Sequence, residues 1–272
     1  MLDLRRRGSA VYLAALGGGR VVFVKGGSGE GAVAAESAGL RWLAEHGDLP
    51  VPEVLGADDD WLVLRYLPGG RPTAEAAERF GRGLAATHLR GAAGFGCPPP
   101  AGPADAWIGL APMRNTTHDT WAAFYAAERI QPYVRMCVDE GVFTGDDAAV
   151  FDKLCARLPE LGLVEEAPAR LHGDLWSGNV YWADDGEAWL IDPAAHGGHR
   201  EADLAMLHLF GTPFLQHIVG GYREAAEQAG APLADGWRDR VKLHQLFPLL
   251  VHAALFGGGY VREALAAAHT AG

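Results

Sequence analysis

Cysteine and long hydrophobic runs are both scarce in this chain of 272 residues. The three cysteines, Cys97, Cys137 and Cys155, are widely spaced, with no Cys-x-x-Cys pair, so the sequence predicts neither a disulfide framework nor a zinc site. A long uncharged stretch, 204–222, is interrupted by histidine, glycine, proline and glutamine, which excludes a bilayer span there. The N-terminus lacks a signal-peptide pattern, so we expect a cytoplasmic protein without a membrane anchor.

Basic residues are also in deficit. Lysine and arginine number 23 against 34 aspartates and glutamates, a formal net charge of −11 that argues against nonspecific nucleic-acid binding and against a polybasic membrane surface. Only three of the basic residues, Lys25, Lys153 and Lys242, are lysines. Each lysine in so arginine-rich a chain is therefore a candidate for a special role. The hydrophobic content of 49% is enough for one or two ordinary domains with a buried core.

The first quarter of the chain has the pattern of a small antiparallel sheet. Two runs rich in β-branched residues, 11–16 and 21–25, flank a glycine cluster at 17–19 and predict a hairpin. A glycine-rich loop then leads into an amphipathic helix that places Glu36 on its apolar face. Two more short strands follow, and we expect the sheet to end near Leu67.

The remainder of the chain is mainly helical in pattern, so the fold class is predicted to be α+β with two parts. We expect residues 1–67 to form the smaller part and residues 68–272 the larger one. Within the larger part, a loop rich in proline and glycine is predicted at 94–112, and an aromatic helix over 120–133 should end or kink at Pro132.

One short segment with the pattern of two β-strands interrupts the helices and carries the most informative polar residues. If 180–182 pairs with 189–191 in a tight hairpin, Asn179 and Asp192 come together at its base. An amide oxygen and a carboxylate suit Mg²⁺, which prefers oxygen ligands. Asp174 lies on the loop that leads into the hairpin and could accept the proton of an attacking hydroxyl. The alternative is a solvated hairpin whose Asp and Asn residues only form turns.

Asp-x4-Asn followed by an Asp at the end of a strand is the arrangement of phosphoryl transfer in kinase folds. Such folds also need a lysine on an upstream strand, paired with a helical glutamate, to hold nucleotide phosphates. Lys25 ends the second predicted strand, and a buried Glu36 would be costly unless it were paired. Glu30 in the glycine-rich loop is the competing partner for Lys25.

The motifs resemble the fructosamine kinase, or ketosamine kinase, family within the aminoglycoside phosphotransferase and choline kinase-like superfamily. The strongest match is HGDLWSGN at 172–179, with Trp176 directly after the Asp-Leu pair. Further similar segments are WAAFYAAERIQP at 121–132, DPAAHGGHREADLAML at 192–207 and HQLFPLLVHAALFGGGY at 244–260. Together they extend over most of the chain and imply a two-lobed protein kinase-like fold.

The resemblance implies roles for individual residues. Asp174 would be the catalytic base, Asn179 and Asp192 the Mg²⁺ ligands, and Lys25 the phosphate anchor with Glu36 as its partner. The other implied positions are a phosphate-covering loop at Arg6, Arg7, Gly8, Ser9 and Ala10, a hinge from Arg65 to Leu67 that meets adenine through backbone groups, and Asp203 as a brace of the catalytic loop.

Substrate contacts are less well defined by the motifs. Trp176 could touch the sugar or amine of the acceptor, whereas His172 is expected to orient the loop, and His196, His199 and Arg200 are expected to be structural.

The implied activity is ATP-dependent phosphorylation of a sugar hydroxyl of ketosamines, with Mg²⁺, in a monomer that acts on small ketosamines or on glycated amines and proteins. Two alternatives remain open. One is a phosphotransferase of the same fold acting on an aminoglycoside or a choline-like alcohol. The other is a nucleotide-binding module without catalysis, suggested by the single glycine, Gly8, in the phosphate loop.

Overall fold

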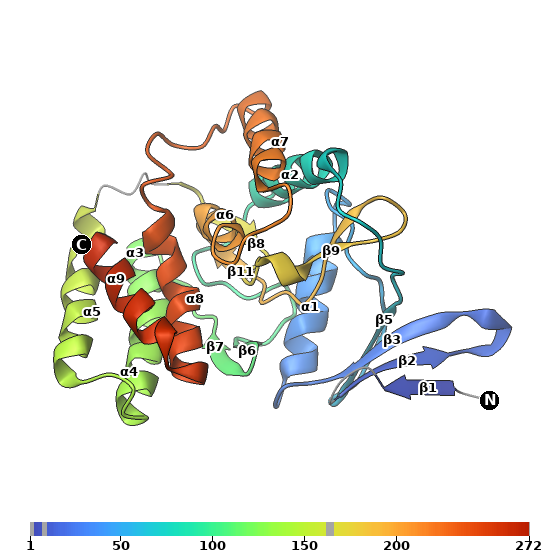
Figure 1. The fold of residues 1–272 in the computed structure, drawn as a ribbon, viewed down its shortest axis with the longest axis horizontal. Helices are drawn as coiled ribbons and strands as arrows, with labels where there is room; N and C mark the ends of the chain where they lie inside the picture. The colour runs from blue at the N-terminus through green and yellow to red at the C-terminus, as the bar shows by residue number, and fades with distance from the viewer. Residues whose placement is uncertain (1–2, 7–9, 162–165, 272) are drawn as a thin grey trace.

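The N-terminal part of the chain forms one antiparallel sheet with a helix packed against it (Figure 1). The computed structural model describes residues 3–6, 10–161 and 166–271. The sheet has the order β1-β2-β3-β5-β4, with β1 at Asp3–Arg6, β2 at Val11–Ala15, β3 at Val21–Gly26, β4 at Val54–Ala57 and β5 at Trp61–Arg65. Helix α1, Ala32–Ala44, buries Leu40 and Leu43. The predicted hairpin, helix and later strands are thus confirmed, and β1 is an additional strand.

The turn between β2 and β3 depends on glycine. The backbone N–H of Leu16 donates to the carbonyl of Arg20 at 2.7 Å, and Gly18 and Gly19 adopt φ values of +80° and +78°. Side chains other than glycine rarely adopt this left-handed conformation. The turn sets the register that places Lys25 opposite Val11 on β2. On the other side of β3, Lys25 lies opposite Leu62 on β5. Lys25 is therefore on the central strand of the sheet.

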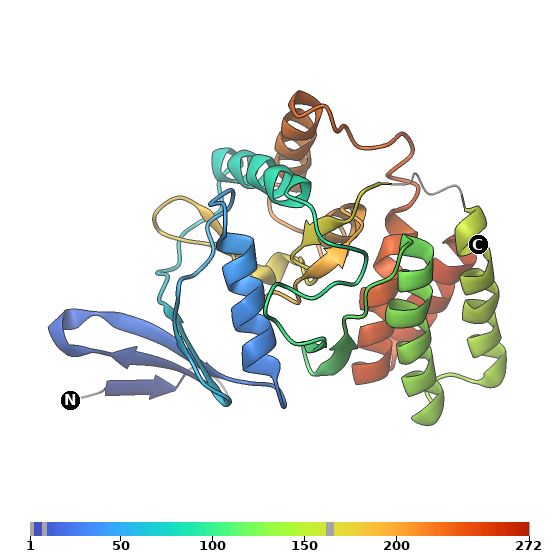
Figure 2. The same cartoon turned by 180° about the vertical axis from the view of Figure 1, so that it is seen from behind.

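The C-terminal part is mostly helical and lies to the other side of α1 (Figures 1 and 2). Its helices are α2 Ala74–Leu89, α3 Trp121–Phe124, α4 Gln131–Asp139, α5 Gly145–Arg157, α6 Glu201–Leu207, α7 Leu215–Gln228, α8 Val241–Phe256 and α9 Gly259–Ala271. Helices α4, α5, α8 and α9 gather at the end of the molecule farthest from the sheet and enclose one apolar core. None of the described helices has the length and apolar character needed to cross a membrane.

Helices α2 and α7 pack through glycine. A Cβ atom on Gly81 would collide with the carbonyl oxygen of Ile218, and one on Gly221 would collide with the carbonyl oxygen of Glu78. Because both glycines lack a side chain, the two backbones approach closely. Leu84 on α2 and Ile218 on α7 belong to a second core, which continues to Leu62 in the sheet.

Two short strand pairs lie between the sheet and the helical end. Strands β9, Val180–Trp182, and β10, Ala188–Leu190, form the predicted hairpin, and β8, Ala169–Leu171, pairs with β11, His196–Gly198. The sequence predicts the second hairpin strand at 189–191, one residue too late. The ladder ends at Leu190 opposite Val180, because the chain turns at Asp192, whose φ is +51°.

The segment 94–112, predicted as a loop, contains a further hairpin. Strand β6, Asp105–Ile108, pairs with β7, Ala111–Arg114, and Gly109 in the turn has φ of +57°. Alternate residues of the hairpin are buried, so it follows the usual period of a half-buried sheet. The density of proline and glycine around it hides this pattern, and the loop prediction was wrong for these residues.

The aromatic helix does not end at Pro132. The chain remains helical from α3 into α4, and the segment between them, Tyr125–Ile130, has π-helical hydrogen bonding. Pro132 is the second residue of α4, and it has no backbone N–H to donate to a carbonyl of the helical turn before it. The irregularity predicted at Pro132 is therefore a change of hydrogen-bond pattern just before it.

Candidate active site

The loop between β8 and β9 holds Asp174 and Asn179 against each other. The Nδ2 of Asn179 donates to the backbone carbonyl of Asp174 at 2.8 Å and to its Oδ2 at 3.0 Å. A short 3₁₀ turn, Ser177–Asn179, precedes β9 and makes this return possible. Because Nδ2 is engaged in this way, Oδ1 is the atom of Asn179 that could bind a cation.

Asp192 completes this group of residues at the base of the hairpin. The backbone N–H of Ile191 donates to the carbonyl of Asn179 at 3.2 Å, and Nδ2 of Asn179 lies 3.5 Å from the carbonyl oxygen of Asp192. The Asp192 side chain is 48% exposed. The structure thus brings Asp174, Asn179 and Asp192 together, and their amide and carboxylate oxygens are the ligand type that Mg²⁺ prefers.

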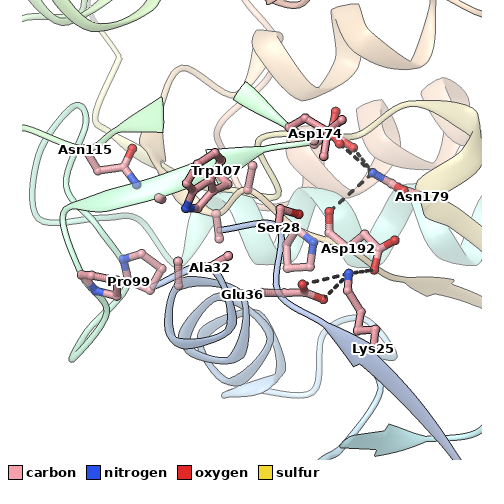
Figure 3. Close-up of a pocket in the computed structure, with 18 of the residues that line it drawn as sticks. Lys25, Ser28, Ala32, Glu36, Pro99, Trp107, Asn115, Asp174, Asn179 and Asp192 are labelled. Carbon is pink, nitrogen blue, oxygen red and sulfur yellow. Dashed lines mark hydrogen bonds and ion pairs between the residues drawn. The ribbon is translucent and has the colours of Figure 1, made fainter. Parts of the chain in front are cut away.

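Lys25 links the sheet to this group (Figure 3). Its Nζ lies 2.9 Å from Oε2 of Glu36 on α1 and 2.9 Å from Oδ1 of Asp192. Burial alone would lower the pKa of Lys25, but the two carboxylates outweigh it and hold the pKa above its ordinary value. Burial raises the pKa of Glu36 to about 7, against the opposing effect of Lys25. Glu36, and not Glu30, is the partner of Lys25.

The carboxyl group of Asp174 has a strongly shifted pKa. Burial raises the pKa to about 7; the hydrogen bond from Asn179 opposes the shift, and the nearby carboxylates of Asp192 and Asp203 add to it. A general base works best when its pKa lies close to the working pH. Asp174 therefore has the protonation behaviour that proton abstraction near neutral pH requires.

Asp203 and His172 hold the loop that carries Asp174 in place through hydrogen bonds. Asp203 on α6 accepts the backbone N–H of His172 at 2.7 Å and that of Gly173 at 2.9 Å, and Nε2 of His88 lies 3.2 Å from the same carboxylate. His172 directs Nε2 at the carbonyl oxygen of Ile191, 2.9 Å away, so it links the loop to the end of the hairpin.

Two cavities meet at Asp192. The first, of about 370 Å³, is lined by Lys25, Glu36, Asp174 and Asn179 (Figure 3). Trp176 also lines it. The second, of about 350 Å³, is mostly apolar and is lined by the predicted hinge, 65–67. Its remaining lining residues are Leu13, Phe23, Pro52, Leu64, Tyr181, Ile191 and Asp192.

Two residues of the predicted hinge, Arg65 and Leu67, contact other residues of the chain. The guanidinium of Arg65 lies over the ring of Trp189, 5.4 Å from its centroid, and the hydroxyl of Tyr181 donates to the carbonyl of Leu67 at 3.0 Å. The predicted phosphate-loop residues Gly8 and Ser9 lie outside the described residues, as does Arg7. Arg6 belongs to strand β1 instead of the loop in which it was predicted.

Trp176 lines the first cavity and is 39% exposed. Its ring meets that of Phe210 edge to face, with centroids 6.0 Å apart. The structure therefore places Trp176 where an acceptor could reach it. Two other residues of this cavity have no signal in the sequence, because Trp107 lies in the unpredicted β6–β7 hairpin and Asn115 directly follows it.

His196, His199 and Arg200 are buried and do not line the cavity with Asp174. Burial lowers the pKa of both histidines to about 3, and Arg200 pairs with Glu166 at 2.6 Å. The His199, Glu201 and His244 ligand atoms lie within 4.8 Å of one another. Arg240 already binds both carboxylate oxygens of Glu201, so a divalent cation would add uncompensated buried charge, and we assign this cluster a structural role.

A sheet lobe bearing a lysine–glutamate pair and a helical lobe bearing an Asp, Asn, Asp group around one hairpin define the class of protein kinase-like phosphotransferases. The family model for fructosamine kinase matches residues 10–270, so the chain belongs to the fructosamine kinase family. It is therefore an enzyme that transfers a phosphoryl group to an alcohol, and the family and fold imply ATP as the donor.

Related sequences and structures agree with this placement. A probable ketoamine kinase of Synechocystis sp. is 35% identical over 235 residues, which is 85% of this chain and 75% of the relative. One from Thermus thermophilus is 34% identical over 227 residues, covering 84% of this chain and 78% of the relative. A crystal structure of a candidate fructosamine-3-kinase from Thermobifida fusca is 45% identical, with a TM-score of 0.90 over 100% of this chain and 93% of that one.

More distant structures share the fold alone. The choline kinase LicA from Streptococcus pneumoniae is 15% identical, with a TM-score of 0.65 over 99% of this chain and 93% of that one. This likeness confirms the predicted two-lobed α+β fold.

Proposed function

We propose that this enzyme phosphorylates a sugar hydroxyl of ketosamines, the adducts of sugars with amines, with ATP and Mg²⁺ as cosubstrate and cofactor. Membership of the family supports the choice of substrate class. The observation that carries the mechanism is the convergence of Asp174, Asn179, Asp192 and the Lys25–Glu36 pair at the meeting point of two cavities. Phosphorylation of the sugar would make the adduct labile, so that the amine is released.

Each residue of the site has a proposed role. Asp174 orients the acceptor hydroxyl and takes its proton, as its position beside Asn179 and its raised pKa support. Asn179 and Asp192 supply the oxygen atoms that hold Mg²⁺. Lys25, held in place by Glu36, binds the nucleotide phosphates. ATP, when bound, supplies the γ-phosphoryl group, so catalysis by this chain consists mainly of positioning and charge neutralisation.

The nucleotide base is proposed to occupy the apolar cavity beside the hinge. Backbone groups between Arg65 and Leu67 would contact adenine, and Gly8 and Ser9 would cover the phosphates. We further propose that the boundary between the two lobes follows Leu67, so that residues 1–67 carry most nucleotide contacts and residues 68–272 carry the catalytic loop and the acceptor site. The last strand of the sheet ends at Arg65, which supports this division.

The test is ADP release from ATP·Mg²⁺ with fructosyl-lysine, ribulosyl-lysine, a panel of aminoglycosides, choline, and no acceptor. We expect turnover with at least one ketosamine and none above background with the other alcohols. Asp174→Asn should retain ATP binding while it lowers the rate by several orders of magnitude. Turnover of an aminoglycoside or of choline in preference to every ketosamine would overturn the proposed substrate class, and an active Asp174→Asn enzyme would overturn the role of the base.

A further inference from the structure

The side chain of Asn115 is a buried hydrogen-bond donor in the wall of the cavity that holds Asp174. Asn115 follows strand β7 and is only 2% exposed, and its backbone N–H donates to the carbonyl of Ala104 at 2.7 Å. Its Nδ2 has no hydrogen-bond partner among the described residues. Figure 3 shows Asn115 at the opposite end of the cavity from Lys25. Such a donor costs free energy as long as it stays unpaired.

Arg129 fixes which end of the amide faces away from it. Its Nη2 donates to Oδ1 of Asn115 at 2.7 Å, and its Nη1 donates to the carbonyl of Arg114 at 2.8 Å. A guanidinium can only donate hydrogen bonds, so the atom of Asn115 that meets it must be the oxygen. Nδ2 is therefore the unpaired end, and the amide cannot turn over without breaking the bond to Arg129.

Arg129 is itself held in one position. It lies in the π-helical segment and is 1% exposed, with its guanidinium 4.6 Å from the ring centroid of Phe124 and 5.3 Å from that of Phe247. The hydrogen bonds that its guanidinium donates go to carbonyl and amide oxygens and not to a carboxylate within the described chain. Burial lowers the pKa of Arg129 to about 10, which leaves the group charged at neutral pH.

The charge of Arg129 determines what Asn115 can bind. A donor that points its N–H at the amide oxygen polarises the amide and strengthens the N–H bonds at its other end as donors. A positive charge behind an N–H donor attracts an oxygen lone pair and repels an ammonium group. This wall of the cavity is therefore suited to an oxygen atom of a ligand and unsuited to a cation.

We propose that Nδ2 of Asn115 donates a hydrogen bond to an uncharged sugar oxygen of the acceptor, and that this contact selects oxygen-rich acceptors over those that would place a cationic group there. The inference rests on the proposed function, because it assumes that the sugar of a ketosamine enters this cavity. A volume of about 370 Å³ lies within the range of small-molecule sites, about 300–1,000 Å³. Asn115 is then a specificity-determining residue that the sequence motifs do not identify.

The decisive variant is Asn115→Asp, which is nearly isosteric. An aspartate still offers an oxygen to Arg129, so the buried guanidinium keeps its partner, but the N–H donor is gone. We expect the KM for fructosyl-lysine to rise about tenfold or more, which is the cost of one lost hydrogen bond at a buried site, while the KM for ATP stays within about threefold. Asp105→Asn on the same hairpin is the control, because the Asp105 side chain is 92% exposed.

Substrate analogues separate the possible partners of Asn115. Fructosyl-lysine and the monofructosyl derivative of cadaverine differ only in the carboxylate, so an equal KM increase for both in Asn115→Asp identifies a sugar oxygen as the partner. An increase for fructosyl-lysine alone identifies the carboxylate and overturns the proposal. Deoxy analogues of the sugar provide a second measure that does not depend on the folding of a variant. One of them should bind wild-type enzyme about tenfold more weakly than the parent compound.

The remaining outcomes distinguish the inference from the proposed function. If wild-type enzyme turns over fructosyl-lysine and Asn115→Asp has the same acceptor KM, the inference is wrong and the proposed function stands. If no deoxy analogue binds more weakly, the inference is also wrong. If wild-type enzyme neither binds nor phosphorylates either fructosyl compound, the proposed function fails and the inference fails with it.

Discussion

The carboxylate of Asp203 accepts the backbone N–H of Gly173 at 2.9 Å, directly before Asp174 in the chain. Asp203 is 1% exposed; burial alone would raise its pKa, but hydrogen bonds and charge from His88 and His172 hold the pKa below the ordinary value. It is therefore a charged, buried group whose hydrogen bonds all go to the backbone of His172 and Gly173 and to the side chain of His88. The loop is positioned by helix α6 before any ligand binds.

Replacing Asp203 by asparagine should damage both stability and catalysis. An asparagine can accept only one of the two backbone N–H groups, and its own NH₂ would face the other. We expect a loss of about 2–3 kcal/mol in the free energy of unfolding, measured in urea, and a fall in kcat of at least about tenfold. Asp184→Asn, in the exposed turn of the β9–β10 hairpin, is the matched control and should change neither quantity. A stable and fully active Asp203→Asn enzyme would show that the loop does not need this brace.

Lys25 should be essential for phosphoryl transfer from ATP, whereas the exposed Lys153 should not be. Lys25→Met removes the charge that is held between Glu36 and Asp192, and loss of one preorganised charge in a phosphoryl-transfer site costs about 10²–10³ in rate. We expect a fall of that size in kcat/KM for ATP. The control is Lys153→Met on helix α5, where the lysine is exposed.

The lysine experiment needs a separate check of folding, because Lys25→Met leaves Glu36 buried without its partner. The pKa of Glu36 is already raised to about 7, so the carboxyl can become protonated instead of staying charged. Circular dichroism melts should therefore show a folded variant. Activity within threefold of wild type in folded Lys25→Met protein would exclude Lys25 as the phosphate anchor.

Activity should depend on pH through Asp174. Its pKa is raised to about 7, and only the deprotonated carboxylate can accept a proton, so kcat/KM should rise with pH up to about 8 and then level off. Protonation of Glu36, whose pKa is also about 7, weakens the pair with Lys25 and acts in the same direction. The measurement is the pH profile of kcat/KM from pH 5 to 9 at constant ionic strength. A profile that is flat from pH 5 upward would mean that Asp174 has an ordinary pKa in the working enzyme.

The convergence of the proposed catalytic residues could be predicted from sequence because these residues are close in the chain. Asp174, Asn179 and Asp192 belong to one loop and one hairpin, and the pairing of two short strands is enough to bring them together. Lys25 and Glu36 are only 11 residues apart, on a strand and the helix that follows it. The contact between Lys25 and Asp192, 167 residues apart, needs the two lobes to meet and follows only from the fold as a whole.

The acceptor side of the site could not be predicted in this way. Asn115 is identified by its missing hydrogen-bond partner and by the bond from Arg129, and neither is visible in a sequence. The strands that carry it to the cavity are short and surrounded by proline and glycine, so their alternating pattern is weak. The apolar cavity beside the hinge is assembled from several strands, so Phe23 and Tyr181 have no common local signal.

Alanine substitutions at two glycines with nearly the same backbone conformation should distinguish the cost of backbone strain from the cost of a steric collision. Gly173 in the catalytic loop has φ of +81°, and Gly186 in the exposed hairpin turn has φ of +83°. A Cβ atom on Gly186 would meet nothing within 4 Å, whereas one on Gly173 would collide with the carbonyl oxygen of Ala194. Gly186→Ala should therefore cost only the left-handed strain, about 1 kcal/mol, while Gly173→Ala should cost about 2–4 kcal/mol and also displace Asp174. Urea unfolding measures the stabilities, and kcat with a ketosamine measures the displacement. Equal stability losses with full activity in both variants would mean that the loop can move away from Ala194 without moving the catalytic carboxylate.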